Sequence, residues 1–378
     1  MNTRNARKTA ARRMFLVLPA ATVALSLSAC GVIDGVGSDS ASATPKKGND
    51  ITVGLLLPEK ENQRYEKFDY PIIKDQVGVL TKHQGKVVYA NAGQDAERQS
   101  AQMEGLIDDK VDVILLDAVD AKSIAPTVRK AKDAGIPVIA YDRLAQGPID
   151  AYISFDNELV GQVQGRAVVE ALGTKSATSK IVMMNGSKTD PNAGQFKKGA
   201  LSELEDKVNI VKSYDTVDWK PENAKRNMAQ AISEVGLSNI AAVYSANDGM
   251  AGAVIDALKE AGADRIPPVT GQDADLTAVQ RIIAGQQYMS VYKPYPEEAT
   301  NAAEMAVARV QGRSIEFDAL TRDSVDSPTD KKIPAMLVQV VALTKDNIEE
   351  TVLKDSIYTV KDLCAPKYAT ACGHIGLH

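Results

Sequence analysis

The chain has 378 residues, and its 49 acidic and 44 basic side chains give a formal net charge of −5. An acidic chain without a basic cluster in its folded part argues against a nucleic-acid partner. About 330 residues follow residue 49. This exceeds the usual size of one hydrophobic core, so two domains are expected.

Residues 1–29 are predicted to be an export signal. Basic side chains up to Arg13 precede a largely apolar run from Phe15 to Leu27, which is short for a membrane span of about 20 residues. The tetrapeptide Leu27–Cys30 (Leu-Ser-Ala-Cys) resembles the lipobox of bacterial lipoproteins, in which the cysteine thiol is diacylated and cleavage leaves the cysteine as the new N-terminus. Lipidation of Cys30 is therefore expected. The alternative is an ordinary secretory signal with a chance cysteine.

Two further features concern export and anchoring. The pair Arg12-Arg13 also resembles a twin-arginine export signal. Residues 30–49 are dominated by Gly, Ser, Ala, Asp, Thr and Lys, which favours a flexible tether between the lipid and the fold. The expected location is the outer face of the cell membrane.

Strand and helix patterns alternate regularly from Ile51 onward. A helical stretch ends near Lys82, a second helix begins near Asp95, and Gly135 ends a third. This β-α-β order predicts an α/β fold with a doubly wound parallel sheet. The strands expected in this half are Ile51–Leu57, Lys86–Ala90, Val113–Leu116, Pro137–Tyr141 and Ala151–Phe155.

The same pattern restarts after residue 156, which predicts a second lobe of similar size, and ligands favour the interface between two such lobes. Helices are expected at Glu158–Leu172, Asn192–Leu204, Pro221–Val235, Gly249–Ala261 and Leu276–Ala284. Strands are expected at Lys180–Asn185, Ile210–Tyr214, Ala241–Ser245, Val269–Gly271 and Ser290–Tyr292. The helix Glu297–Val310 and the strand-like Ala335–Val341 follow.

Signatures of enzymes and metal sites are missing from the sequence. It contains no Gly-x-Ser-x-Gly elbow, no phosphate-binding loop and no His-Glu-x-x-His. His83, His374 and His378 do not have metal-ligand spacing. We therefore expect no catalytic residue, no metal and no cofactor. Cys364 and Cys372 are expected to form a disulfide that closes a small C-terminal loop, and two free thiols are the alternative.

Polar side chains follow the strands one after another, at the sheet edge where parallel α/β sheets bind ligands. For any single pair, solvated loop charges are the more common explanation. Carboxylates, amides and basic groups together can bond the hydroxyls of a sugar, while aromatic rings pack against its C–H faces. The strand ends carry Asp142-Arg143, Asp156-Asn157, Asn185, Asn247-Asp248, Gln272-Asp273 and Lys293, and loops add Arg64-Tyr65, Asp190, Asn192 and the only tryptophan, Trp219. Trp219 is either an ordinary core residue or, as its polar neighbours favour, a loop residue.

Several stretches together resemble the solute-binding proteins of bacterial ATP-binding-cassette (ABC) sugar importers, in the group that binds ribose, galactose and xylose. Within that group, the chain is most similar to the binders of D-xylose. The stretches are Ala140–Arg143, Tyr152–Glu158, Pro221–Ala224, Ser245–Asp248, Gly271–Leu276 and Val291–Pro294.

The resemblance implies a periplasmic-binding-protein type I fold, with two doubly wound lobes joined by a multi-strand hinge. The first lobe would comprise residues 50–155 with about 293–330, and the second residues 156–292 with about 331–350, followed by a C-terminal tail at 351–378. It also implies a monomer that captures a monosaccharide, D-xylose foremost, for a permease with its ATPase subunit. Glucose, galactose or arabinose binding is an alternative, as is a receptor for a chemosensory or sensor-kinase system.

Residue by residue, the resemblance implies a set of sugar contacts. The family usually has tryptophan where this chain has Tyr65, and more often asparagine where it has Pro191, so affinity or sugar preference is expected to differ. Asp156 and Asn157 are candidates for the hinge. The implied hydrogen-bonding residues are Arg64, Asp142, Arg143, Asp190, Asn192, Asn247, Asp273 and Lys293, with Trp219 and Tyr65 as stacking rings.

Overall fold

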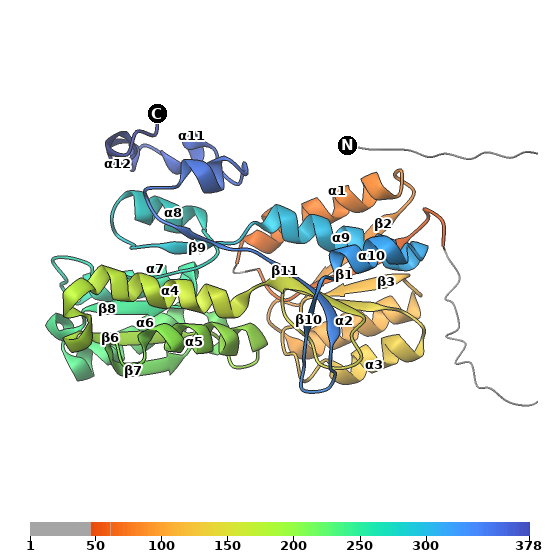
Figure 1. The fold of residues 1–378 in the computed structure, drawn as a ribbon, viewed down its shortest axis with the longest axis horizontal. Helices are drawn as coiled ribbons and strands as arrows, with labels where there is room; N and C mark the ends of the chain where they lie inside the picture. Colours follow the sequence, from red (N-terminus) through yellow and green to blue (C-terminus); the bar gives the residue numbers. More distant parts are fainter. Residues whose placement is uncertain (1–46, 61) are drawn as a thin grey trace, which may run out of the picture. The chain divides into compact units, whose positions relative to one another are not determined.

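The computed structural model describes residues 47–60 and 62–378. The predicted export signal, Cys30 and most of the predicted tether lie outside the described residues. The described chain contains two α/β lobes (Figure 1). The first is built on a seven-stranded sheet, and the second on a three-stranded sheet with a separate two-stranded one.

The first lobe has the strand order β10-β11-β5-β4-β3-β1-β2, and only β10 runs antiparallel to its neighbour. Apolar side chains fill a core on each face, which explains why these strands read as continuous apolar runs. Helices α1 (Tyr70–Leu80), α9 (Tyr295–Gln311) and α10 (Ser314–Leu320) cover one face, and α2 (Ala96–Asp108) and α3 (Ala125–Asp133) cover the other. The strands are β1 (Thr52–Leu57), β2 (Lys86–Asn91), β3 (Val113–Leu116), β4 (Val138–Tyr141), β5 (Ala151–Phe155), β10 (Asp323–Val325) and β11 (Ile333–Val338).

The second lobe repeats this layering around the parallel order β7-β6-β8. Its strands are β6 (Lys180–Asn185), β7 (Asn209–Asp215) and β8 (Ala242–Ser245). Helices α4 (Asn157–Leu172) and α5 (Pro191–Leu204) pack on one face, and α6 (Pro221–Val235) and α7 (Asp248–Glu260) on the other. The predicted strand Val269–Gly271 is reduced to a single bridge between Val269 and Val243. Helix α8 (Leu276–Ile283) follows.

The chain passes between the lobes three times, which agrees with the expected multi-strand hinge. It crosses from β5 into α4, from β9 (Ser290–Tyr292) into α9, and from β11 into β12 (Val341–Leu343). The hinge candidates Asp156 and Asn157 lie at the first crossing. There, Asp156 caps α4 by accepting a hydrogen bond from the amide of Leu159 at 2.9 Å.

The lobe boundary near residue 331 differs from the expectation. The sequence placed residues 331–350 in the second lobe, whereas β11 pairs with β5 in the first sheet. Ile333 and Ala335 are buried in the core beneath α2 and α3, which gives β11 its place. Only β12 reaches the second lobe, where it pairs with β9. Strand β10 was not predicted at all.

The predicted C-terminal tail, residues 351–378, packs together with the two residues before it on α8 and β9 of the second lobe around a small apolar core. This segment contains a π-helical turn (Glu349–Leu353) and the short helices α11 (Val360–Leu363) and α12 (Ala369–His374). A disulfide joins Cys364 and Cys372, whose Cα atoms lie 5.9 Å apart.

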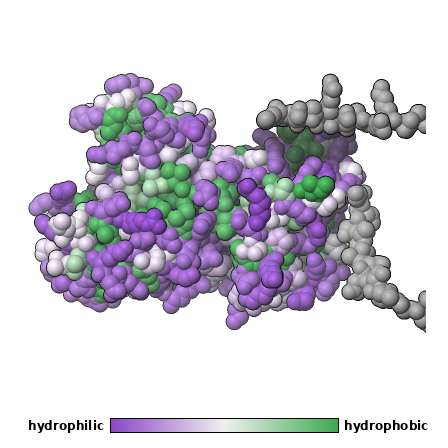
Figure 2. All heavy atoms as spheres, in the orientation of Figure 1, coloured by the Kyte–Doolittle hydropathy of each residue, from purple (hydrophilic) through white to green (hydrophobic). Residues whose placement is uncertain are grey.

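Hydrophilic residues cover most of the face shown in Figure 2, because the large apolar side chains are held in the cores. Among the residues that the structure describes, no helix combines the length and the apolar character that a membrane span requires.

Candidate ligand-binding pocket

One pocket is lined by side chains from both lobes, at the carboxyl ends of strands and in the loops that follow them. Nine of the ten residues predicted to contact a ligand line this pocket: Tyr65, Asp142, Arg143, Asp190, Asn192, Trp219, Asn247, Asp273 and Lys293. The tenth, Arg64, is not one of the lining residues.

Asp142 stands directly after β4 with a left-handed φ of 56°. Its carbonyl accepts a hydrogen bond from the hydroxyl of Tyr152 at 2.9 Å, which helps to fix this backbone. Its carboxylate accepts from the hydroxyl of Tyr65 at 3.2 Å and lies 3.5 Å from Nη1 of Arg64. Burial acts to raise the pKa of Asp142, but three basic side chains, Arg64 first, outweigh burial and hold the pKa below its usual value.

Arg143, the next residue, joins carboxylates of both lobes. Its Nε lies 3.0 Å from Oδ2 of Asp190 in the second lobe and 3.5 Å from Oδ1 of Asp117 at the end of β3. Its Nη1 donates to the carbonyl of Ala118 at 3.2 Å. Burial raises the pKa of Asp117 and of Asp190, and the positive charge of Arg143 opposes both shifts. Asp117 therefore supports Arg143 without lining the pocket itself.

Trp219 ends a short 3₁₀ turn (Val217–Trp219) in the connection between β7 and α6, where its polar neighbours predicted a loop. Its Nε1 donates to Oδ2 of Asp190 at 3.1 Å. The ring of Phe196, on α5, meets it edge to face with 6.2 Å between ring centres. A Cβ added at Gly186 would lie 2.1 Å from an indole carbon. The absence of a side chain at Gly186 thus makes room for the tryptophan ring.

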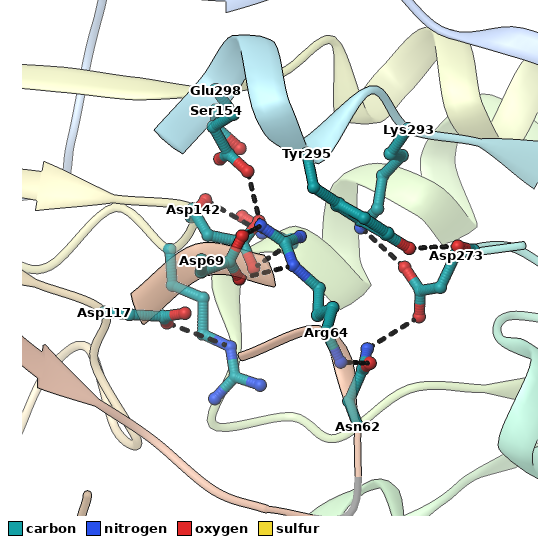
Figure 3. Close-up of polar contacts among 12 residues, drawn as sticks. Asn62, Arg64, Asp69, Asp117, Asp142, Ser154, Asp273, Lys293, Tyr295 and Glu298 are labelled. Atoms are coloured by element: carbon teal, nitrogen blue, oxygen red, sulfur yellow. Dashed lines mark hydrogen bonds and ion pairs between the residues drawn. The ribbon is translucent and has the colours of Figure 1, made fainter. Parts of the chain in front are cut away.

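Asp273, Lys293 and Asn247 line the pocket from the second lobe and its crossing into α9. Oδ1 of Asp273 lies 2.8 Å from Nζ of Lys293, and Oδ2 accepts from Nδ2 of Asn62 at 3.0 Å (Figure 3). Asn247 caps α7 by accepting from the amide of Met250 at 2.9 Å. The cap fixes the Asn247 side chain at the helix start, beside the pocket.

Arg64 does not line the pocket but pairs with Asp142 within a buried ion network (Figure 3). Its Nε donates to Asp69 at 2.8 Å, and its Nη2 pairs with Glu298. The guanidinium carbon lies 4.4 Å from the ring centre of Tyr295. Burial raises the pKa of Asp69 and Glu298, while the neighbouring Arg64 lowers both. Arg64 thus reaches the pocket through Asp142.

Three of the polar contacts that cross from one lobe to the other join two residues that both line the pocket. Arg143 pairs with Asp190, and Asn62 donates to Asp273. Nδ2 of Asn192 donates to the carbonyl of Asp142 at 3.0 Å and lies 3.4 Å from its Oδ1. Part of the contact between the two lobes is therefore made by the same residues that line the pocket.

Sequence reasoning left several lining residues off the predicted set. Gln272 and Asp275 flank Asp273 and could have been found from that position, and Phe196 lies one helical turn after Asn192. No motif pointed to Asn62, whose contact with Asp273 joins residues 211 positions apart. The missed lining residues are Glu59, Asn62, Phe196, Pro221, Gly249, Gln272 and Asp275.

The arrangement is suited to binding a neutral molecule rich in hydroxyl groups. Carboxylate and amide oxygens accept hydrogen bonds, basic side chains and amides donate them, and the rings of Tyr65, Phe196 and Trp219 supply apolar faces. Arg143 pairs with Asp190, and Lys293 pairs with Asp273, so these opposite charges compensate one another without a charged ligand. Within the described ranges, no group of His, Cys, Asp and Glu side chains is arranged to hold a metal ion.

Comparisons with known proteins identify the family of the chain. The family model of the periplasmic binding protein domain matches residues 53–314. The D-xylose-binding periplasmic protein of Haemophilus influenzae is 32% identical over 334 residues, which cover 87% of this chain and 96% of that protein. The D-xylose-binding periplasmic protein of Escherichia coli is 33% identical over 320 residues, which cover 83% of this chain and 93% of that protein. A solved ABC transporter solute-binding protein from Clostridium phytofermentans with bound β-D-glucose superposes with a TM-score of 0.74 at 27% identity, covering 82% of this chain and 99% of that one. The chain therefore belongs to the periplasmic binding protein family.

Proposed function

We propose that the chain is the extracytoplasmic substrate-binding lipoprotein of an ABC monosaccharide importer and that it captures D-xylose. The observation that carries this proposal is the pocket, which is lined by acidic, basic and amide groups from both lobes together with three aromatic rings. The relatives from H. influenzae and E. coli, both D-xylose-binding proteins by name, support the choice of sugar.

The two lobes have complementary tasks in this proposal. Asp142 and Arg143 in the first lobe receive the sugar hydroxyls, and Tyr65 offers its ring. When the lobes close, groups of the second lobe complete the hydrogen bonds and Trp219 stacks on the C–H face of the sugar. The closing groups are Asp190, Asn192, Asn247, Asp273 and Lys293. Arg64 serves the sugar indirectly, by holding Asp142.

The closed, loaded protein delivers its sugar to a membrane permease, and the ATPase subunit of that importer drives uptake. A lipid on Cys30 holds the protein at the outer face of the membrane. The protein acts as a monomer and catalyses no reaction, since the proposed task is capture and delivery.

Calorimetry of the purified protein tests the sugar assignment. D-xylose is expected to give saturable heat at one site per chain, and D-glucose, D-galactose, L-arabinose and D-ribose serve as competitors. A chain that gives no heat with any of the five would contradict the sugar proposal.

Two variants test the site. Asp142→Ala removes one partner of Arg64 and the acceptor of Tyr65. Asp273→Ala removes the ion-pair partner of Lys293. Either change should weaken D-xylose binding by about 1–3 kcal/mol or more. Asp108→Ala, at the exposed end of α2, serves as the control. Unchanged affinity in both pocket variants would rule out this pocket as the binding site.

D-glucose is the second candidate sugar, because the C. phytofermentans structure contains β-D-glucose. A pentose and a hexose differ by one hydroxymethyl group, so the same polar lining can serve either ring. The competition arm of the calorimetry separates them, since the cognate sugar displaces the other at the lower concentration.

A further inference from the structure

The turn Asp273–Asp275, which presents two acidic side chains to the pocket, has an unusual backbone. Asp273 and Ala274 have φ angles of 95° and 54°, so two successive residues with side chains occupy the left-handed region. Such residues adopt this region at a free-energy cost and keep it only where their surroundings hold them. The partners of this turn are therefore part of the pocket's construction.

The amides of the turn are held from within the second lobe. The amide of Asp273 donates to the carbonyl of Val291 at 2.9 Å, and that of Ala274 to the hydroxyl of Ser290 at 3.1 Å. Both acceptors belong to β9. These bonds tie one side of the turn to the hinge strand.

The two carbonyls of the turn are held by tyrosine hydroxyls from elsewhere in the chain. Tyr295, at the start of α9 in the first lobe, donates to the carbonyl of Asp273 (Figure 3). Tyr358, in the C-terminal tail, donates to the carbonyl of Ala274 at 3.1 Å. Phe68 contacts both rings, with ring centres 5.8 Å from Tyr295 and 6.3 Å from Tyr358.

The tail is fastened on both sides of Tyr358. Before it, Asp355 accepts from the hydroxyl of Tyr292 on β9 at 2.6 Å. After it, the carbonyl of Asp362 accepts from Gln280 on α8 at 2.9 Å, and the Cys364–Cys372 disulfide closes the remaining segment. The tail therefore holds the Tyr358 hydroxyl against the Ala274 carbonyl.

We propose that Tyr358 is a positioning residue of the pocket and that the disulfide-closed tail is thereby part of the ligand site. Its hydroxyl stabilises the left-handed turn in which Asp273 faces Lys293 and the cavity. The proposal rests on the proposed sugar binding for one of its two tests, which measures D-xylose affinity. The other test, hydrogen exchange, does not need a ligand.

The ligand-free readout is hydrogen exchange. Tyr358→Phe keeps the ring and removes only the hydroxyl, so it should speed exchange of the amides of residues 273–276 at least 3-fold, with little change at β6 and β8. Tyr368→Phe, a half-buried tail tyrosine that stacks with Lys367, is the matched control and should leave these amides unchanged. Equal exchange in Tyr358→Phe and the native protein would overturn the proposal.

The binding readout is a double-mutant cycle. Tyr358→Phe should weaken D-xylose affinity about 3- to 30-fold, whereas in an Asp273→Asn background the same change should cost less than 2-fold. An equal loss in both backgrounds would place the action of Tyr358 elsewhere and overturn its positioning role. If the native protein binds no sugar, the proposed function fails, and hydrogen exchange still decides whether Tyr358 holds the turn.

Discussion

The indole ring of Trp219 occupies space that is free only because Gly186 has no side chain. Gly186→Ala would place a methyl group 2.1 Å from the indole, so the ring must move and release Asp190. We expect a loss of at least about 1–3 kcal/mol in sugar affinity and a shift in the emission of the only tryptophan. Gly194→Ala is the control, because a Cβ there meets nothing within 4 Å. Native emission and affinity in Gly186→Ala would show that the ring does not need this space.

The buried carboxyl of Asp248 is expected to make the folding stability depend on pH. Burial raises the pKa of its carboxyl to about 7, against the lowering effect of Arg281. Between its ordinary value of 3.8 and about 7, the folded protein keeps a proton that the unfolded chain has lost. Stability therefore falls as pH rises through this window.

Asp248→Asn should flatten this decline, with a difference from the native protein of roughly 1–4 kcal/mol across the window. Urea unfolding between pH 4 and 8 measures it, and Asp256→Asn, exposed on the same helix, is the control. Parallel profiles for Asp248→Asn and the native protein would show that Asp248 does not hold the proton.

The disulfide between Cys364 and Cys372 is expected to stabilise the C-terminal tail. The disulfide closes a short loop of sequence separation 8, and cross-linking a loop of this size contributes about 2–3 kcal/mol by limiting the unfolded chain. Cys364→Ser with Cys372→Ser should therefore make residues 359–378 open to proteolysis and fast exchange. The cores of the two lobes should keep their protection. Equal protease resistance with and without the disulfide would contradict this local role.

The elements also show what periodicity can and cannot predict. The predicted doubly wound fold is confirmed by the order of the strands. It could be predicted because buried strands appear in the sequence as apolar runs and most helices end at polar or glycine positions. Strand β10 was missed because Asp323 and Ser324 are exposed and carry no apolar signal. β11 was assigned to the wrong lobe because an apolar run does not say which sheet it joins. The polar residue Asp273 could be identified from the sequence. The tyrosines that bond the carbonyls of Asp273 and Ala274 could not, since Tyr358 lies 84 residues from Ala274.

For the whole molecule, Asn62 supplies a contact that must break whenever the lobes separate. Asn62→Ala removes the hydrogen bond to Asp273. This should destabilise the closed, sugar-bound state by about 1 kcal/mol and raise the sugar dissociation rate roughly 5-fold. Stopped-flow emission of Trp219 measures this rate. Gln63→Ala, in the same segment but bonded to Lys67 on the surface, serves as the control. Equal dissociation rates for Asn62→Ala and the control would show that this contact does not hold the closed state.

The three crossings between the lobes have a consequence for how the protein can be divided. The first lobe takes β1–β5 from one part of the chain and α9, α10, β10 and β11 from another, with most of the second lobe between them. A fragment ending at residue 292 would lack two of the seven strands of the first sheet and the helices α9 and α10. Neither lobe is encoded as one uninterrupted piece, so exchanging one contiguous gene segment cannot replace a whole lobe.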